Sequence, residues 1–140
     1  MQKRLFKLLA FLLFSSASLF AQDAKIFGEW ELVEARENGR VFYAQRNYEN
    51  EPKEILAFSE DGSYRKVHQN QQPRTWEGDW VSRDNDRLGF RTIQSNGERV
   101  ENPAFDNQWK IMKVAEQMLQ IAQLTEYGEP RFIYTYYRKS

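Results

Sequence analysis

The chain has 140 residues, with 20 basic and 20 acidic side chains, a formal net charge of zero and no cysteine. This length fits one domain, the lack of cysteine excludes a disulfide framework, and the balanced charge gives no electrostatic basis for binding nucleic acid. Aromatic residues make up 15% of the chain, so large rings must fill much of its core.

The first 21 residues have the composition of an export signal. Three basic residues lie within the first seven positions, an apolar run covers residues 8–14, and small residues lead to Ala21. The run is shorter than the ~20 residues of a membrane-spanning helix, and without cysteine there is no site for a lipid anchor. The segment resembles the export signals of Gram-negative bacteria. We therefore expect cleavage after Ala21 and a location in the periplasm or outside the cell.

Residues 22–140 are then expected to form one domain. Because the leader removes three basic residues, 17 basic and 20 acidic ones remain, for a net charge of −3. The first predicted strand covers residues 28–35 and opens on Gly28 and Trp30. Glycine at the mouth of a strand lets the backbone bend, and the indole supplies a large side chain for the core. The polar loop at residues 36–52 follows, in which a short strand and a helical turn both stay open.

The clearest local signal is a hairpin between predicted strands at residues 53–59 and 63–68. The connecting residues 60–62 end in glycine, which is the usual way to make a hairpin with a bulge. This register predicts that Phe58 lies opposite Tyr64 on one face of the sheet.

Five further strands are predicted from the alternation of apolar and polar residues. They cover residues 74–82, 87–93, 107–114, 118–124 and 131–138. A second polar loop at residues 94–106 contains Asn-Gly and Asn-Pro pairs, which break regular structure. Along the strand at 74–82, Trp76, Gly78 and Trp80 share one face.

Eight alternating strands predict an all-β fold, an eight-stranded antiparallel up-and-down β-barrel. Closing the sheet into a barrel removes its exposed edges. Successive connections lie at opposite ends of such a barrel. The connections after the second, fourth and sixth strands are short and the others are mostly long, so we expect one end closed by hairpins and one open end. The side chains expected toward the closed end are Trp30, Phe58, Tyr64, Trp80, Leu88, Leu119 and Tyr136.

Four short segments carry a resemblance to a known family. They are Gly28-Glu29-Trp30, Phe58-Ser59-Glu60-Asp61-Gly62-Ser63-Tyr64, Gly78-Asp79-Trp80 and Tyr136-Tyr137-Arg138. With these segments, residues 22–140 resemble a small bacterial lipocalin-like domain, although a Thr-Asp-Tyr-like turn is missing between the sixth and seventh strands. The resemblance implies that Gly28, Trp30 and Arg138 close one end of the barrel, with the guanidinium across the indole. Such a contact contributes about 0.5–2 kcal/mol.

The residues that could support catalysis are few. His68 is the single histidine, so no histidine cluster can bind zinc, and a Ser-His-Asp triad could be built only with His68. The carboxylate pairs Glu29 and Glu31, and Glu77 and Asp79, face outward when the tryptophans of their strands face inward, so they are expected at the solvated surface. We therefore expect no enzyme activity, no cofactor and no metal, with a haem or metal ligand role for His68 as a minor alternative.

A pocket is predicted in the open half of the barrel. Its candidate ligand-binding residues are Leu56, Lys66, His68, Trp76, Phe90, Trp109, Phe132 and Tyr134, and Phe42 and Tyr48 are expected near its mouth. Lys66, His68 and Thr92 are expected in this half, and such basic and polar residues would be unusual in a dry core.

Two functions follow from this reading. The first is an exported lipocalin-like binding protein for a small apolar or amphipathic molecule, without a membrane span or a nucleic acid partner. Lys66 would favour a carboxylate, as in a fatty acid, through a charge-assisted hydrogen bond. The alternative is a filled barrel that acts as a structural or protein-interaction module through its long loops.

Overall fold

The computed structural model describes residues 25–45, 53–69, 72–84 and 86–139. These residues form ten strands: β1 (Gly28–Glu37), β2 (Arg40–Ala44), β3 (Lys53–Phe58), β4 (Ser63–Gln69), β5 (Arg74–Arg83), β6 (Arg87–Ser95), β7 (Glu98–Arg99), β8 (Asp106–Val114), β9 (Met118–Leu124) and β10 (Pro130–Arg138). The predicted leader, residues 1–21, lies outside the described residues. No helix within the described ranges is long and apolar enough to cross a membrane.

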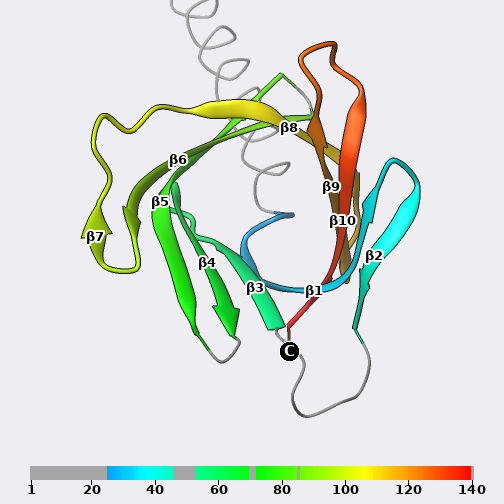
Figure 1. The fold of residues 1–140 in the computed structure, drawn as a ribbon, viewed down its shortest axis with the longest axis horizontal. Helices are drawn as coiled ribbons and strands as arrows, with labels where there is room; N and C mark the ends of the chain where they lie inside the picture. The colour runs from blue at the N-terminus through cyan, green and yellow to red at the C-terminus, as the bar shows by residue number, and fades with distance from the viewer. Residues whose placement is uncertain (1–24, 46–52, 70–71, 85, 140) are drawn as a thin grey trace, which may run out of the picture.

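Eight of the strands close into an antiparallel barrel, which confirms the predicted fold class. Around the ring the order is β1, β3, β4, β5, β6, β8, β9 and β10, and β10 pairs with β1 to close it. Figure 1 shows the ring end on. Each predicted strand corresponds to one strand of the ring, because alternation with a period of two marks strands that have one face in a core.

Strand β1 is shared between two neighbours on one of its edges. Its first half pairs with β3, its second half pairs with β2, and β10 runs along its other edge. The turn from β1 to β2 holds Asn38 at φ 50° and Gly39 at φ 83°. Two successive residues with positive φ form the type of turn that joins tight hairpins. Of the two alternatives for the polar loop at residues 36–52, a short strand is therefore the one that residues 40–44 adopt.

Strand β7 was not predicted. It pairs with the end of β6 through a turn in which Asn96 and Gly97 both have positive φ, at 54° and 79°. The Asn-Gly pair thus turns the chain into a short hairpin within the segment that was expected to be a loop. Strand β7 lies outside the ring, beside β6 (Figure 1).

The hairpin between β3 and β4 has the predicted form. Phe58 pairs with Tyr64, the amide of Ser59 donates to the carbonyl of Ser63 at 2.9 Å, and Gly62 has a φ of 87°. The connection between β9 and β10 differs from expectation, because residues 125–129 form an equally tight turn. The open end is therefore bordered by tight turns, between β1 and β2 and between β9 and β10, as well as by long connections.

The closed half of the barrel holds the core. Its buried side chains include Trp30, Phe58, Trp80, Leu88 and Leu119. Trp30 is fully buried, and its Nε1 donates to the carbonyl of Ile26 at 2.8 Å. Ile26 is itself buried, so the segment that precedes β1 covers this end of the barrel.

Arg138 joins three separate segments at the closed end. Its Cζ lies 4.2 Å from the centroid of the Trp30 ring. Its guanidinium donates to the carbonyls of Lys25, Phe27 and Glu116 at 2.9, 2.7 and 2.7 Å. A Cβ on Gly28 would lie 2.9 Å from Nη1 of Arg138, so a glycine at this position leaves room for the guanidinium.

Gly78 marks the closest approach of two strands. In β6 an extra residue forms a bulge between the partners of Glu77 and Gly78, which brings the β6 backbone toward β5. A Cβ on Gly78 would lie 1.9 Å from the carbonyl oxygen of Arg91. Glycine is therefore required here for lack of space, whereas Trp76 and Trp80 on either side point into the barrel as predicted.

Candidate functional site

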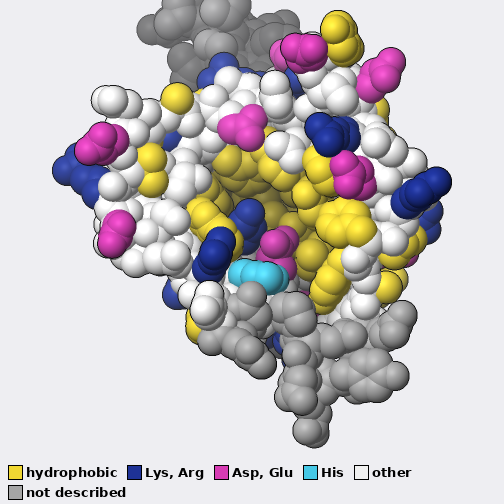
Figure 2. Space-filling model, in the orientation of Figure 1, with side chains coloured by type: hydrophobic (Ala, Val, Ile, Leu, Met, Phe, Trp, Pro, Cys, Tyr) yellow, Lys and Arg dark blue, Asp and Glu magenta, His cyan; other side chains and the backbone are white. Residues whose placement is uncertain are grey.

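A cavity of about 420 Å³ occupies the open half of the barrel. Figure 2 shows it as a hollow with a hydrophobic floor, into which a basic and an acidic side chain extend. Its volume lies within the range of about 300–1,000 Å³ found for small-molecule sites. The open half is therefore not filled by the described side chains.

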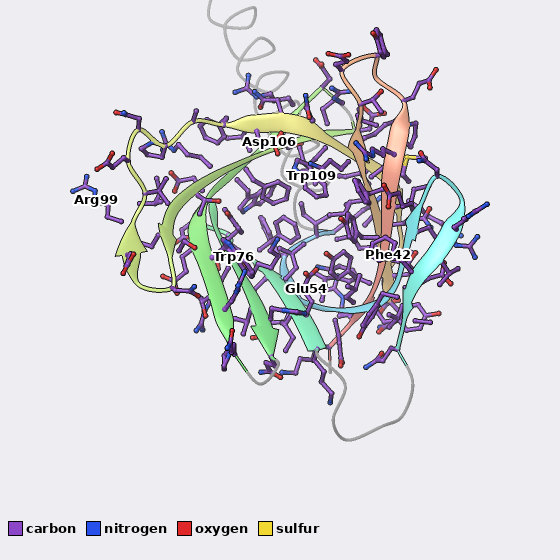
Figure 3. All side chains as sticks on the ribbon, in the orientation of Figure 1. Phe42, Glu54, Trp76, Arg99, Asp106 and Trp109 are labelled. Carbon is purple, nitrogen blue, oxygen red and sulfur yellow. The ribbon has the colours of Figure 1, made fainter. Side chains whose placement is uncertain are left out.

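Six of the eight predicted ligand-binding residues line this cavity. They are Leu56, Lys66, Trp76, Phe90, Trp109 and Tyr134. Trp76 and Trp109 come from β5 and β8, the two strands on either side of β6 in the ring (Figure 3). The structure brings these six together because the alternation along β3, β4, β5, β6, β8 and β10 turns the same face of each strand inward.

The two remaining predicted ligand-binding residues do not line the cavity. His68 is half-buried in β4, directly across the β3–β4 ladder from the lining residue Glu54, and Figure 2 shows the histidine at the rim of the hollow. Phe132 stacks on Tyr134 with ring centroids 6.3 Å apart and also contacts Phe42. Phe42 is 57% exposed and lies between β10 and β2, away from the cavity (Figure 3). Tyr48, expected near the mouth, lies outside the described residues.

Ten further residues line the cavity. Thr92 was expected in the open half of the barrel, whereas nine others were not predicted there: Glu54, Tyr64, Val100, Asn102, Pro103, Ala104, Asp106, Ile121 and Tyr136. Tyr64 and Tyr136 were expected in the closed half, but both are buried at the border of the cavity. Their long side chains bring a hydroxyl group to the cavity from positions deeper in the barrel.

One wall of the cavity comes from the segment between β7 and β8. Four of its residues, from Val100 to Ala104, line the cavity. Phe105 holds the segment on the barrel, because its ring lies 4.8 Å from the guanidinium of Arg91 and 5.8 Å from that of Arg83. At the other end, the amide of Val100 donates to Ile93 at 2.8 Å.

Aromatic rings form a continuous chain beside the cavity. Phe90 contacts Tyr64 at 5.1 Å and Trp109 at 5.7 Å between ring centroids, and Trp109 contacts Tyr134 at 5.8 Å. Ring pairs at these separations stabilise one another by about 0.5–1.5 kcal/mol beyond the area they bury. The rings therefore support a preformed apolar wall.

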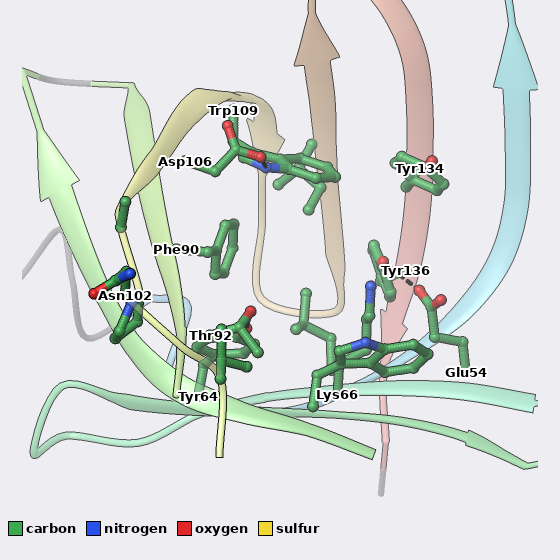
Figure 4. A pocket seen from close by; sticks show the side chains of 16 residues that line it. Glu54, Tyr64, Lys66, Phe90, Thr92, Asn102, Asp106, Trp109, Tyr134 and Tyr136 are labelled. Carbon is green, nitrogen blue, oxygen red and sulfur yellow. Dashed lines mark hydrogen bonds between the residues drawn. The ribbon is translucent and has the colours of Figure 1, made fainter. Parts of the chain in front are cut away.

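Hydrogen bonds hold most polar groups of the lining (Figure 4). The hydroxyl of Tyr136 donates to Oε2 of Glu54 at 2.7 Å, and the hydroxyls of Tyr64 and Thr92 share a hydrogen bond of 2.5 Å. Asp106 accepts from Nε1 of Trp109 and from the amide of Gln108, both at 3.0 Å. These bonds fix the direction of each polar group.

Lys66 is the one basic residue among the lining side chains. Its Nζ lies 4.6 Å from the centroid of the Trp76 ring, which faces it across the β4–β5 ladder. With Glu54 and Asp106, the cavity lining holds two acidic residues and one basic residue. The lining therefore presents both positive and negative charge to a ligand, and not the positive charge of Lys66 alone.

The tyrosine hydroxyls of the cavity stay protonated at neutral pH. Burial raises the pKa of Tyr136 well above its ordinary value of 10.0, and the charge of Glu54 and the hydrogen bond to it add to the shift. Burial also raises the pKa of Tyr134, with further contributions from Glu54 and Glu37. Burial is the main cause of the raised pKa of Tyr64 as well.

Tyr136 is expected to make the fold sensitive to alkali. Because its folded pKa is raised, its contribution to the free energy of unfolding is complete below the unfolded value of 10.0 and is lost as the pH rises above it. Urea unfolding at pH 8 and pH 11 should show a smaller loss of stability for Tyr136→Phe than for the wild type. Tyr127→Phe, at a position 85% exposed, is the control and should lose as much as the wild type. An equal loss in all three would contradict this role.

Among the residues that the structure describes, no group of at least three histidine, cysteine, aspartate or glutamate side chains could hold a metal ion. The apolar wall and the few directed polar groups can hold and orient a molecule.

In comparisons with known proteins, the chain matches no protein-family model, no curated protein and no solved structure. The closed eight-stranded barrel is compatible with a lipocalin-like fold.

Proposed function

We propose that this chain is a lipocalin-like binding protein that holds a small apolar or amphipathic molecule in the open half of its barrel. The observation that carries the proposal is the cavity of about 420 Å³ with aromatic rings along its wall. An apolar wall with a few directed polar groups is the composition of small-molecule sites. A fatty-acid-like molecule is one member of this ligand class.

Contacts at the closed end add support for the lipocalin-like assignment. Arg138 lies across Trp30, as the resemblance implies, and Gly28 leaves space for it. The alternative, a filled barrel that acts only through its loops, would not leave a cavity of this size. Export to the periplasm or the cell exterior and a role without catalysis complete the proposal and rest on the sequence.

Calorimetric titration with decanol, a neutral apolar probe, tests the proposal. We expect binding to the wild type and about tenfold weaker binding to Ala104→Trp. Ala104 lines the cavity and is exposed, so an indole at this position can be accommodated by the fold and would occupy part of the cavity. Ala44→Trp is the matched control, since Ala44 is exposed on β2 and does not line the cavity. Failure of decanol to bind, or equal affinity for both variants, would refute binding in this cavity.

A further inference from the structure

Two opposite charges line the same wall of the cavity. Lys66 of β4 lies across the ladder from Leu56 of β3, and Glu54 lies two residues along β3 from Leu56. Residues two apart on a strand share a face, so both charged side chains project inward beside each other. Figure 4 shows Glu54 and Lys66 on this side of the cavity, away from Asp106 and Trp109.

The two charges are held by neutral partners. Lys66 Nζ lies over the ring of Trp76, and Glu54 accepts a hydrogen bond from Tyr136. None of the ion pairs formed among the described residues joins Glu54 to Lys66. An ammonium has three donors and a carboxylate has two acceptor oxygens. Each group therefore keeps hydrogen-bonding capacity that faces the cavity.

Asp106 does not share this property. Its Oδ1 accepts from the amide of Gln108 and its Oδ2 from Nε1 of Trp109, and the residue is exposed. Both oxygens of the Asp106 carboxylate therefore already accept a hydrogen bond from residues of its own strand. Glu54 and Lys66 remain as the charged groups that a ligand inside the cavity can meet as partners.

We propose that the ligand carries an ammonium and a carboxylate on one polar head, as an α-amino acid does, joined to an apolar body. The ammonium would bond to Glu54 and the carboxylate to Lys66, while the apolar body packs on Phe90 and Trp109. Opposite charges set side by side match a zwitterion and oppose a head with a single charge, because one wall charge would then repel it. This inference rests on the proposed function, since it concerns the same cavity.

Four probes with the same ten-carbon chain separate the head group from the apolar body: decanol, decanoic acid, decylamine and α-aminodecanoic acid. Calorimetric titration should show that α-aminodecanoic acid binds about tenfold more tightly than decanoic acid or decylamine, as expected for one further charge-assisted hydrogen bond. Glu54→Gln should move the preference toward decanoic acid, and Lys66→Met should move it toward decylamine. Glutamine retains an acceptor for Tyr136, so the first variant preserves that contact.

Control variants are Glu60→Gln and Lys113→Met, which alter exposed charges outside the cavity lining and should leave the order of the probes unchanged. If decanol binds but the α-amino acid binds no more tightly than the acid or the amine, the zwitterion proposal is wrong and the proposed function stands. An unchanged probe order in both Glu54→Gln and Lys66→Met would overturn it as well. If none of the four probes binds, both proposals fall.

Discussion

Replacing Trp30 with alanine is expected to lower the free energy of unfolding by roughly 3–5 kcal/mol, the range for a buried large aromatic side chain. The side chain is 0% exposed, so the change would leave a cavity at the centre of the closed end. It would also remove the donor to Ile26 and the ring beneath Arg138. Urea unfolding followed by circular dichroism would measure the loss.

The matched control for this variant is Tyr137→Ala. Tyr137 is an aromatic residue of β10 with a side chain 55% exposed, and we expect its loss to cost less than about 1 kcal/mol. A double-mutant cycle of Trp30→Ala and Arg138→Ala should show coupling, because the two side chains touch. Additive costs in that cycle would contradict the contribution of the guanidinium–indole contact to stability.

Gly78→Ala should be the costliest exchange of a glycine, with a loss of about 2–4 kcal/mol, at the upper end of overpacking effects. The added methyl group would lie 1.9 Å from the backbone carbonyl oxygen of Arg91. Because this oxygen belongs to the backbone of β6, it cannot turn away from the methyl group as a flexible side chain could. Strand β6 would have to move, and with it Phe90 and Thr92 in the cavity wall.

A second glycine variant separates crowding from backbone conformation. Gly62 has positive φ but open space around its Cβ position, and asparagine tolerates positive φ. Gly62→Asn should therefore cost under about 1 kcal/mol in the same urea unfolding experiment. A loss for Gly78→Ala as small as that for Gly62→Asn would show that the β5–β6 approach is not tight in solution.

Sequence alternation predicted the ring of the barrel because the side-chain period of a strand is independent of its neighbours. The hairpin at Gly62 was predicted from its connecting residues, because three local residues set that turn. The turns at Asn38 and Asn96 each contain an Asn-Gly pair, which is also a local signal. Their strands show no alternation, because β2 has 5 residues that are mostly apolar and β7 has only 2 residues. Turn chemistry was thus the better guide to these two strands.

The depth of a residue in the barrel could not be predicted in the same way. Alternation assigns a side chain to the inner face, but its height depends on strand tilt and on bulges such as that opposite Gly78. Tyr64 and Tyr136 were for this reason expected below the cavity that they border. The segment from Val100 to Ala104 shows no alternation of apolar and polar residues that could predict its position. Contacts of Phe105 with two arginines distant in sequence hold it against the barrel.

The pairing of β1 with β10 has a consequence for how the barrel folds. These strands lie about as far apart in sequence as the barrel allows, with Trp30 opposite Arg138. Such a contact carries a large loop-closure entropy, and proteins rich in distant strand pairings fold slowly, in milliseconds to seconds. Before β10 docks, an open sheet would have unpaired edges at β1 and at the last strand added. We therefore expect Arg138 to seal the ring late in folding, and a partly assembled sheet to be the species most at risk of aggregation.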